Sequence, residues 1–184
     1  MLEMRIHGRG GQGVVTLAEL LAKAALKTGK EVQTFPFFGV ERRGAAVKAA
    51  VRFDSQPIKV RSLSYWPDIL VLMNENLLSL GLADGIAPGA FIVANGEKRL
   101  PVDNKQYLVD AAFIALNNDL TFGGEPYINV PMFGALCRVM DIPLDIVGET
   151  ITEQWGAKKA VPNIAAAREA YEAVRELEGG GAHA

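Results

Sequence analysis

A glycine-rich segment near the start of the chain has the residue types and the spacing of a phosphate-binding loop. Gly8-Arg9-Gly10-Gly11-Gln12-Gly13 follows the pattern G-x-G-x-x-G, between a segment typical of a strand and one typical of a helix. In that pattern the first glycine permits a tight turn, the second lets the backbone approach a ligand, and the third lets the helix pack closely on the strand. Unpaired N–H groups at the start of such a helix attract anions. All six residues are therefore candidate ligand contacts.

The loop lacks the usual companions of a dinucleotide or nucleoside triphosphate site. A dinucleotide site has an acidic residue at the end of the second strand, whereas the second strand predicted here ends in Thr34-Phe35-Pro36. No Gly-Lys-Ser/Thr follows the glycines, as it would in a Walker loop. Two interpretations stay open: the loop binds a phosphate-bearing ligand, or its glycines serve only chain geometry and close packing against a neighbouring subunit.

A pair of arginines supplies the second candidate binding element. Arg42 and Arg43 lie in a glycine-bounded loop, residues 37–44, that follows the second predicted strand. Ligands of a doubly wound sheet bind beyond the carboxyl ends of its strands, and a guanidinium there can hold a phosphate or a carboxylate. The alternatives are a solvated charge or a salt bridge to the neighbouring glutamate. Three large apolar side chains in the same loop favour a surface that another subunit covers.

Few other residues have the setting of a catalytic or metal-binding group. His7 adjoins the glycine loop, but no accompanying constellation suggests chemistry, so a structural role is expected. Cys137 is the single cysteine, which excludes an internal disulfide and an iron–sulfur cluster held by four thiolates of this chain. No histidine or cysteine pair has metal-site spacing. We therefore predict no catalytic residue and no metal site.

The elements around the glycine loop are predicted to form a strand–helix–strand unit. Residues 2–7 alternate as a strand does, 14–27 have helical spacing, and 31–35 form a second strand, which should be the parallel neighbour of the first. Residues 45–60 predict an inserted antiparallel β-hairpin with its turn at Asp54-Ser55-Gln56-Pro57.

Apolar runs further along the chain predict buried strands, and the C-terminal half predicts helices. Strands are expected at 68–73, 90–94 and 108–112. Helices are expected at 75–82, 131–140 and 144–159, and from Pro162, as a first helical residue, to about Leu177. The predicted fold class is α/β: a Rossmann-like, doubly wound, mostly parallel sheet with helices on both faces and the inserted hairpin.

Composition limits the classes of protein to consider. The chain has 184 residues, of which 49% are hydrophobic, enough for one domain over residues 1–178 with a flexible tail at 179–184. The formal net charge of −2 argues against a nucleic-acid partner. No apolar run is long enough to span a membrane, and the N-terminus does not resemble a signal peptide. A cytoplasmic protein is expected.

Two stretches resemble the γ subunits of pyruvate-type 2-oxoacid:ferredoxin oxidoreductases. The first runs from Met4 to Thr16 and continues through Ala18-Glu19-Leu20-Leu21-Ala22, and the second runs from Phe35 to Ala45. The glycine loop and the Gly-Val-Glu-Arg-Arg-Gly loop together make a specific pair of motifs. Residues 62–68 and 129–136 fit the same family, so that the resemblance extends from residue 2 to about residue 177.

The resemblance implies a subunit of an enzyme that oxidatively decarboxylates a 2-oxoacid with coenzyme A, giving an acyl-CoA, carbon dioxide and two electrons. Thiamine diphosphate, Mg²⁺ and [4Fe–4S] clusters are then expected on α, β and δ partner subunits, with ferredoxin or an NAD-linked subunit as the electron acceptor. The chain alone is expected to be inactive. It is expected to brace the catalytic subunits and to contact coenzyme A through the glycine loop, Arg42 and Arg43.

The sequence leaves the oxoacid open among pyruvate, 2-oxoisovalerate, phenylglyoxylate, oxalate and 2-oxoglutarate, because the oxoacid pocket is expected on other subunits. Two further alternatives also stay open. One is a stand-alone nucleotide- or flavin-binding protein, and the other is a scaffold subunit without a ligand.

Overall fold

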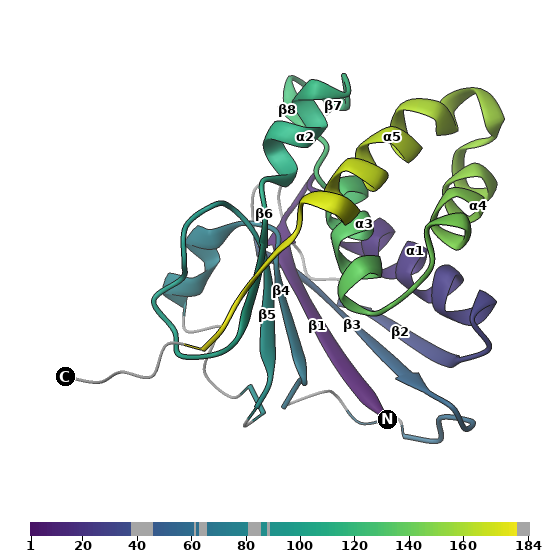
Figure 1. Cartoon of the computed structure of the whole chain (residues 1–184). Coiled ribbons are helices and arrows are strands. Elements are labelled where there is room, and N and C mark those ends of the chain that lie inside the picture. Colours follow the sequence, from purple (N-terminus) through teal and green to yellow (C-terminus); the bar gives the residue numbers. More distant parts are fainter. Residues whose placement is uncertain (38–45, 61, 63–65, 81–85, 88, 180–184) are drawn as a thin grey trace.

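A seven-stranded sheet dominates the described part of the chain. The structure is a computed structural model and describes residues 1–37, 46–60, 62, 66–80, 86–87 and 89–179. The strands are β1 (Leu2–Arg9), β2 (Glu31–Phe37), β3 (Ala46–Asp54), β4 (Ile69–Leu72), β5 (Phe91–Asn95), β6 (Gln106–Val109) and β9 (Arg175–Leu177), in the order β2-β3-β1-β4-β5-β6-β9 (Figure 1). The short strands β7 (Thr121–Phe122) and β8 (Glu125–Pro126) pair separately.

The helices are α1 (Val14–Lys27), α2 (Ala111–Asn117), α3 (Asn129–Val139), α4 (Leu144–Trp155) and α5 (Ala157–Ala173), with a 3₁₀ helix, η1 (Glu75–Leu80). Strands β1, β2, β4, β5 and β6 run in one direction, while β3 and β9 run against them. The predicted α/β class with a mostly parallel sheet and an antiparallel insertion is therefore confirmed.

The antiparallel insertion differs from its prediction in which strands pair. Strand β3 lies between β1 and β2 and is antiparallel to both, so β1 and β2 are not the parallel neighbours that we expected. The hairpin is formed by β2 and β3, and residues 58–60, predicted as its second strand, form no strand. The side chain of Gln33 instead donates to the carbonyl of Ile58 at 2.9 Å.

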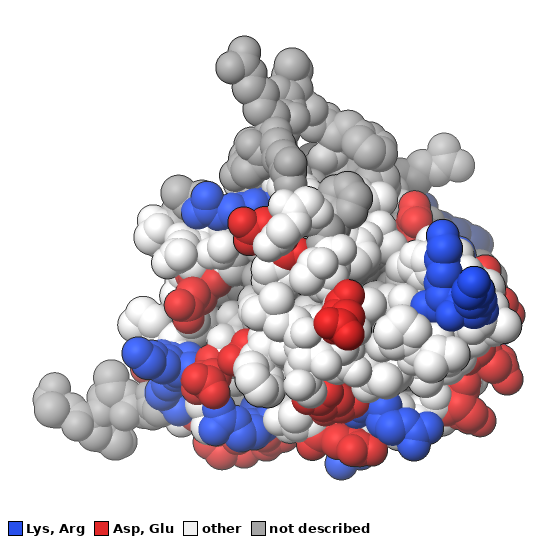
Figure 2. All heavy atoms as spheres, turned by 90° about the horizontal axis from the view of Figure 1, so that it is seen from above, with Lys and Arg blue, Asp and Glu red and all other residues white. Residues whose placement is uncertain are grey.

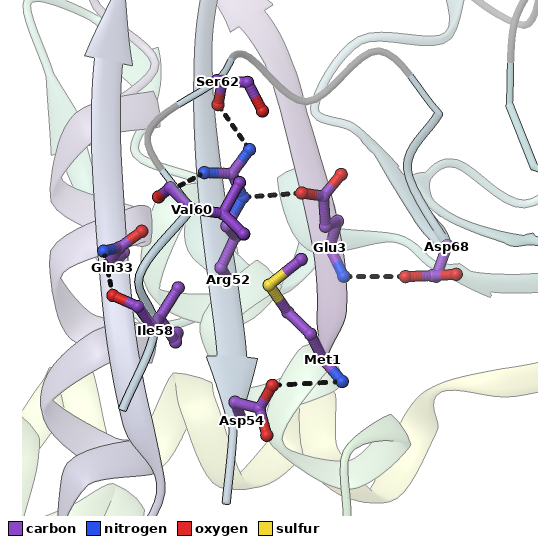
Figure 3. A network of polar contacts seen from close by, with 9 residues as sticks. All are labelled: Met1, Glu3, Gln33, Arg52, Asp54, Ile58, Val60, Ser62 and Asp68. Atoms are coloured by element: carbon purple, nitrogen blue, oxygen red, sulfur yellow. Dashed lines mark hydrogen bonds and ion pairs between the residues drawn. The ribbon is translucent and has the colours of Figure 1, made fainter. Parts of the chain in front are cut away.

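The buried guanidinium of Arg52 holds the segment after β3 against the sheet (Figure 3). Arg52 is 1% exposed, donates to Glu3 Oε1 at 2.6 Å and to the carbonyl of Ser62 at 2.5 Å, and lies over the Phe35 ring. Asp68 accepts from the Glu3 N–H at 2.8 Å, which links β1 to the start of β4. A buried cation is tolerated here because a carboxylate and carbonyl oxygens surround it.

The two faces of the sheet are covered differently. Side chains that point to one face, such as Val71 and Val93, join a large core with residues of all five α-helices. Side chains on the opposite face, such as Leu70 and Ile92, form a smaller cluster. Leu78 of η1 and the loop residues Ile86, Leu100 and Val102 pack against them. In the described residues the α-helices thus lie on one face, where Figure 1 shows α1, α3, α4 and α5 grouped, and the 3₁₀ helix η1 lies on the other. Helices were predicted on both faces, and the one on the second face is a 3₁₀ helix.

The C-terminal half also differs from the prediction in detail. Gly156, with φ +76°, separates α4 from α5, where one helix was predicted over 144–159. Pro162 lies inside α5 instead of starting it. The chain then forms β9, antiparallel to β6, where the helix was predicted to continue to Leu177. The predicted strand 108–112 ends at Val109, because Asp110 caps α2 by accepting from the N–H of Phe113 at 2.9 Å.

Helices α3 and α5 approach closely because residue 134 has no side chain. A Cβ on Gly134 would lie 2.0 Å from the carbonyl oxygen of Ala167, which is backbone and has no rotamer to change. Gly148, in α4, has nothing within 4 Å of the same position. The two helical glycines therefore differ only in what surrounds them.

We expect Gly134→Ala to lower the free energy of unfolding by on the order of 3 kcal/mol, because the helices must separate. Gly148→Ala should raise it by about 0.5–1 kcal/mol, because alanine favours a helix over glycine. Chemical denaturation of both variants measures the difference. Equal stabilities would show that the α3–α5 contact can relax freely.

Candidate functional site

Two adjoining cavities lie at the carboxyl edge of the parallel strands. The larger, of about 710 Å³, is lined by the glycine loop and by residues after β4, β5 and β6. The smaller, of about 300 Å³, lies around the start of α1 and shares Arg9, Gly10, Gly11 and Tyr127 with the larger. From β1 the chain continues to β2 and β3 on one side of this strand, and from β4 it continues to β5 and β6 on the other side of the sheet. The crevice between β1 and β4 is therefore the switch point where α/β sheets bind ligands.

The glycine loop is a closed turn held by its own residues. The N–H of Gln12 donates to the carbonyl of Arg9 at 3.0 Å, and Gln12 Oε1 accepts from the N–H of Arg9 at 2.7 Å. Gly11 and Gly13 have φ values of +97° and +79°, a conformation that favours glycine. Gly8 lies within β1, where a Cβ would be 2.5 Å from Val14 Cγ2, so this glycine gives α1 room and does not form the turn.

The start of α1 offers unpaired backbone donors to the smaller cavity. Gly13 is the N-cap residue and makes no side-chain capping bond, and the first turn holds no acidic residue. Val14, Val15 and Thr16, whose N–H groups occupy the first turn, all line the cavity. The start of the helix therefore carries a partial positive charge that its own sequence does not neutralise.

The two cavities differ in charge. Among its lining residues the larger has four carboxylates and two basic side chains: Glu75, Glu97, Asp110, Glu125, Arg9 and Lys98. Among the described residues that line it, the smaller has Arg9 and no carboxylate. An anionic group is therefore favoured at the smaller cavity and opposed at the larger. Figure 2, viewed from above this edge, shows mostly uncharged atoms in the middle of the face with acidic side chains among them, and basic side chains toward its periphery.

Asn129 is a buried polar residue beside the glycine loop that sequence reasoning did not select. Its side chain is 0% exposed, and neither amide atom has a hydrogen-bond partner. A Cβ on Gly13 would lie 2.9 Å from Asn129 Nδ2, which places the amide directly against the N-cap of α1. Its burial results from the packing of α3 on α1, which no local pattern reveals.

His7 is buried in β1, and the structural role expected from the sequence stays a prediction. It is 5% exposed, pairs with Lys48 across β1 and β3, and lines neither cavity. Burial, together with the positive charges of Arg5 and Lys48, lowers its pKa to about 4. Since Nε2 has no hydrogen-bond partner, protonation in the folded state would add an uncompensated charge.

The remaining candidates are placed as follows. Arg42 and Arg43 lie outside the described residues. Cys137 is buried, and burial raises the pKa of its thiol, as expected for a core residue. Within the described ranges no group of three His, Cys, Asp or Glu side chains is arranged to hold a metal ion, and no helix there is long and apolar enough to cross a membrane.

Comparisons with known proteins identify relatives over nearly the whole chain. The family model described as pyruvate ferredoxin/flavodoxin oxidoreductase matches residues 3–173. The common γ subunit of the pyruvate/ketoisovalerate oxidoreductases of Thermococcus litoralis is 40% identical over 184 residues, which cover 94% of this chain and 96% of that protein. A crystal structure of pyruvate oxidoreductase subunit PORC from Thermotoga maritima superposes with a TM-score of 0.82 at 33% identity, covering 96% of this chain and 98% of that one.

The 2-oxoglutarate:ferredoxin oxidoreductase of Magnetococcus marinus shares the fold, with a TM-score of 0.77 at 21% identity, covering 96% of this chain and 32% of that one. The chain belongs to the pyruvate ferredoxin/flavodoxin oxidoreductase family. Within that family it is a γ subunit of a multi-subunit 2-oxoacid:ferredoxin oxidoreductase. The alternative of a stand-alone nucleotide- or flavin-binding protein is not favoured.

The lowered pKa of His7 predicts a pH-dependent stability. An unfolded histidine binds its proton near pH 6.5 and folded His7 near pH 4, so the unfolded state takes up more protons between these values. The free energy of unfolding therefore has its full contribution from neutral His7 above about pH 6.5, and this contribution is lost as the pH decreases toward 4. Between pH 7 and pH 4 the wild type should lose about 3 kcal/mol more than His7→Gln.

Denaturation at a series of pH values measures this difference. His183→Gln, which removes the other histidine of the chain, is the control and should keep the wild-type pH dependence. Parallel pH profiles for the wild type and His7→Gln would contradict a neutral, buried His7.

Proposed function

We propose that the chain is the γ subunit of a thiamine diphosphate-dependent enzyme that converts a 2-oxoacid and coenzyme A into an acyl-CoA, carbon dioxide and two electrons. In this proposal the chain supplies no catalytic residue. Its single cysteine cannot hold a four-thiolate cluster, so the [4Fe–4S] clusters belong to partner subunits. Thiamine diphosphate and Mg²⁺ are proposed on the α, β and δ partner subunits as well, as the resemblance to the family implies. Ferredoxin, or an NAD-linked subunit, accepts the electrons. Pyruvate is the proposed oxoacid, as in the names of its relatives.

The subunit contributes to the binding of coenzyme A through the glycine loop, residues 8–13, together with Arg42 and Arg43. The uncapped start of α1 supports this role most directly, since the described residues that line the cavity beside it include one arginine and no carboxylate. A phosphate of the coenzyme would accept hydrogen bonds from the first-turn N–H groups. The Magnetococcus marinus oxidoreductase, which shares this fold, was solved with coenzyme A and succinyl-CoA bound.

The proposal also covers the organisation and location of the subunit. Residues 1–178 are proposed to form one domain, which is supported by both apolar clusters being built on the same sheet. Of the tail predicted at 179–184, residues 180–184 lie outside the described residues. The subunit acts in the cytoplasm, where the single thiol and the partner clusters meet a reducing environment.

A negative charge placed in the first turn of α1 should compete with the coenzyme. In the assembled enzyme, Thr16→Glu should raise the KM for coenzyme A about tenfold, because a carboxylate then occupies the positive end of the helix. Thr16→Gln, of the same size but uncharged, is the control. The KM for the 2-oxoacid should stay unchanged in both variants, since decarboxylation takes place on other subunits.

Steady-state kinetics with each substrate varied in turn measures these constants. The same titration with Arg42 and Arg43 both replaced by Ala should raise the KM for coenzyme A roughly ten- to a hundredfold, the loss of a charge-assisted contact. An unchanged KM for coenzyme A in all three variants would contradict this proposal and favour the alternative of a scaffold subunit without a ligand.

Assembly with the partner subunits is proposed to use the exposed face of α2. Phe113 and Leu116 are one helical turn apart and are 61% and 53% exposed. Asp110, the N-cap residue of α2, lines the larger cavity, so this apolar pair adjoins the candidate site. Large apolar side chains in such a position are typical of a contact between subunits.

We expect the double variant Phe113→Ser, Leu116→Ser to lose most of its co-purification with the α, β and δ subunits. Stability of the isolated chain should change little, because neither side chain is buried. Leu26→Ser, on α1 and 55% exposed, is the matched control and should retain the partners. Size-exclusion chromatography of the reconstituted complex distinguishes the two, and full assembly of the double variant would exclude α2 as the contact.

A further inference from the structure

The amide of Asn129 is an unusual group to bury without partners. Both polar atoms of the side chain lack hydrogen bonds while the residue is 0% exposed. A buried, unpaired polar group costs about 1–3 kcal/mol of folding stability, so such a group calls for an explanation. Asn163, in α5, is a contrasting case, since its Nδ2 donates to the carbonyl of Lys159 at 2.8 Å.

Asn129 lies where two helices begin. It is the first residue of α3, and its Nδ2 faces Gly13, the N-cap of α1. Helix α3, like α1, has no side-chain capping bond and no acidic residue in its first turn. Two partial positive charges therefore adjoin with no carboxylate of either first turn to balance them.

The amide of Asn129 adds to this field instead of opposing it. Of its two polar atoms, Nδ2, the positive end of the amide dipole, lies nearer than Oδ1 to the position that a Cβ on Gly13 would occupy. Gly13 also lines the 300 Å³ cavity, where Arg9 is the charged residue among the described residues of the lining. Oriented dipoles that are fixed before a ligand arrives favour a negative charge without the cost of reorganisation.

We propose that Asn129 is an anion-positioning residue that, with the N-termini of α1 and α3, adapts the glycine loop to a phosphate group. It acts through Gly13 and the local field without touching the ligand. The inference rests on the proposed function in that the phosphate would belong to coenzyme A. It differs from that proposal in naming a buried residue whose contribution is to binding and not to stability.

The test compares binding with stability in the full-length chain. Calorimetric titrations with inorganic pyrophosphate and with coenzyme A are made on the wild type, Asn129→Leu and Asn163→Leu. Asn129→Leu should weaken pyrophosphate binding at least about fivefold, the scale of a lost helix-terminus interaction. Its melting temperature should be equal or higher, because the substitution removes two unpaired polar atoms. Asn163→Leu should melt at a lower temperature and bind both probes normally.

A second variant keeps the test decisive if Asn129→Leu folds poorly. Asn129→Asp preserves the shape of the side chain and should weaken pyrophosphate binding by roughly a hundredfold, because a like charge then lies beside the anion. Unchanged affinity in Asn129→Leu, or in Asn129→Asp where only that variant folds, would overturn the inference. An affinity that falls only together with the melting temperature would do the same.

The two probes separate this inference from the coenzyme proposal. Pyrophosphate binding that depends on residue 129, without any binding of coenzyme A, would support the anion site and reject the proposal that coenzyme A is its ligand. Equal binding of coenzyme A by the wild type and Asn129→Leu would support coenzyme A as the ligand and reject the role of Asn129. No binding of either probe to the wild type would overturn both.

Discussion

The close contact between Gly13 and Asn129 is the constraint on which the candidate site depends. Because residue 13 has no side chain, α1 can begin directly against α3, with the two helix N-termini adjoining. Gly8, in β1, also lacks a side chain, and this leaves room for Val14 of α1 to pack onto that strand. The backbone donors of α1 therefore end at the switch point between β1 and β4, beside a cavity that suits an anion. The loop glycines thus serve packing, and the cavity beside them is the candidate ligand site.

Local elements could be predicted from the sequence more fully than their pairing. The apolar patterns of β1, α1, β4 and β5 are sufficient to identify each one. Insertion of β3 between β1 and β2 could not be predicted, because alternation marks a strand without naming its partner. The same holds for β9, which completes the edge beside β6 although its residues suit a helix. Gly156 ends α4 through a positive φ, which competes with the helical pattern on either side of it.

The candidate site was only partly predictable, for a related reason. The glycine loop is continuous in sequence and has a recognisable spacing, so it could be predicted together with its place before α1. Asn129 and the carboxylates Glu75 and Asp110 come from separate segments that only the folded sheet brings to one edge. The acidic residue missing from the end of β2 also has a structural explanation, since the strand beside β1 is the antiparallel β3, which presents its amino end there. The strand end that holds the ribose in a dinucleotide site therefore has no counterpart beside β1.

Backbone protection in the assembled enzyme tests most directly whether the glycine loop contributes to coenzyme binding. Amide hydrogen exchange of residues 8–17 can be followed by mass spectrometry in the complete complex, with and without saturating coenzyme A. The account predicts slower exchange at the N–H groups of Val14, Val15 and Thr16 when the coenzyme is bound, because those groups would then donate to a phosphate. Exchange in this segment that is unchanged by the coenzyme would contradict the account.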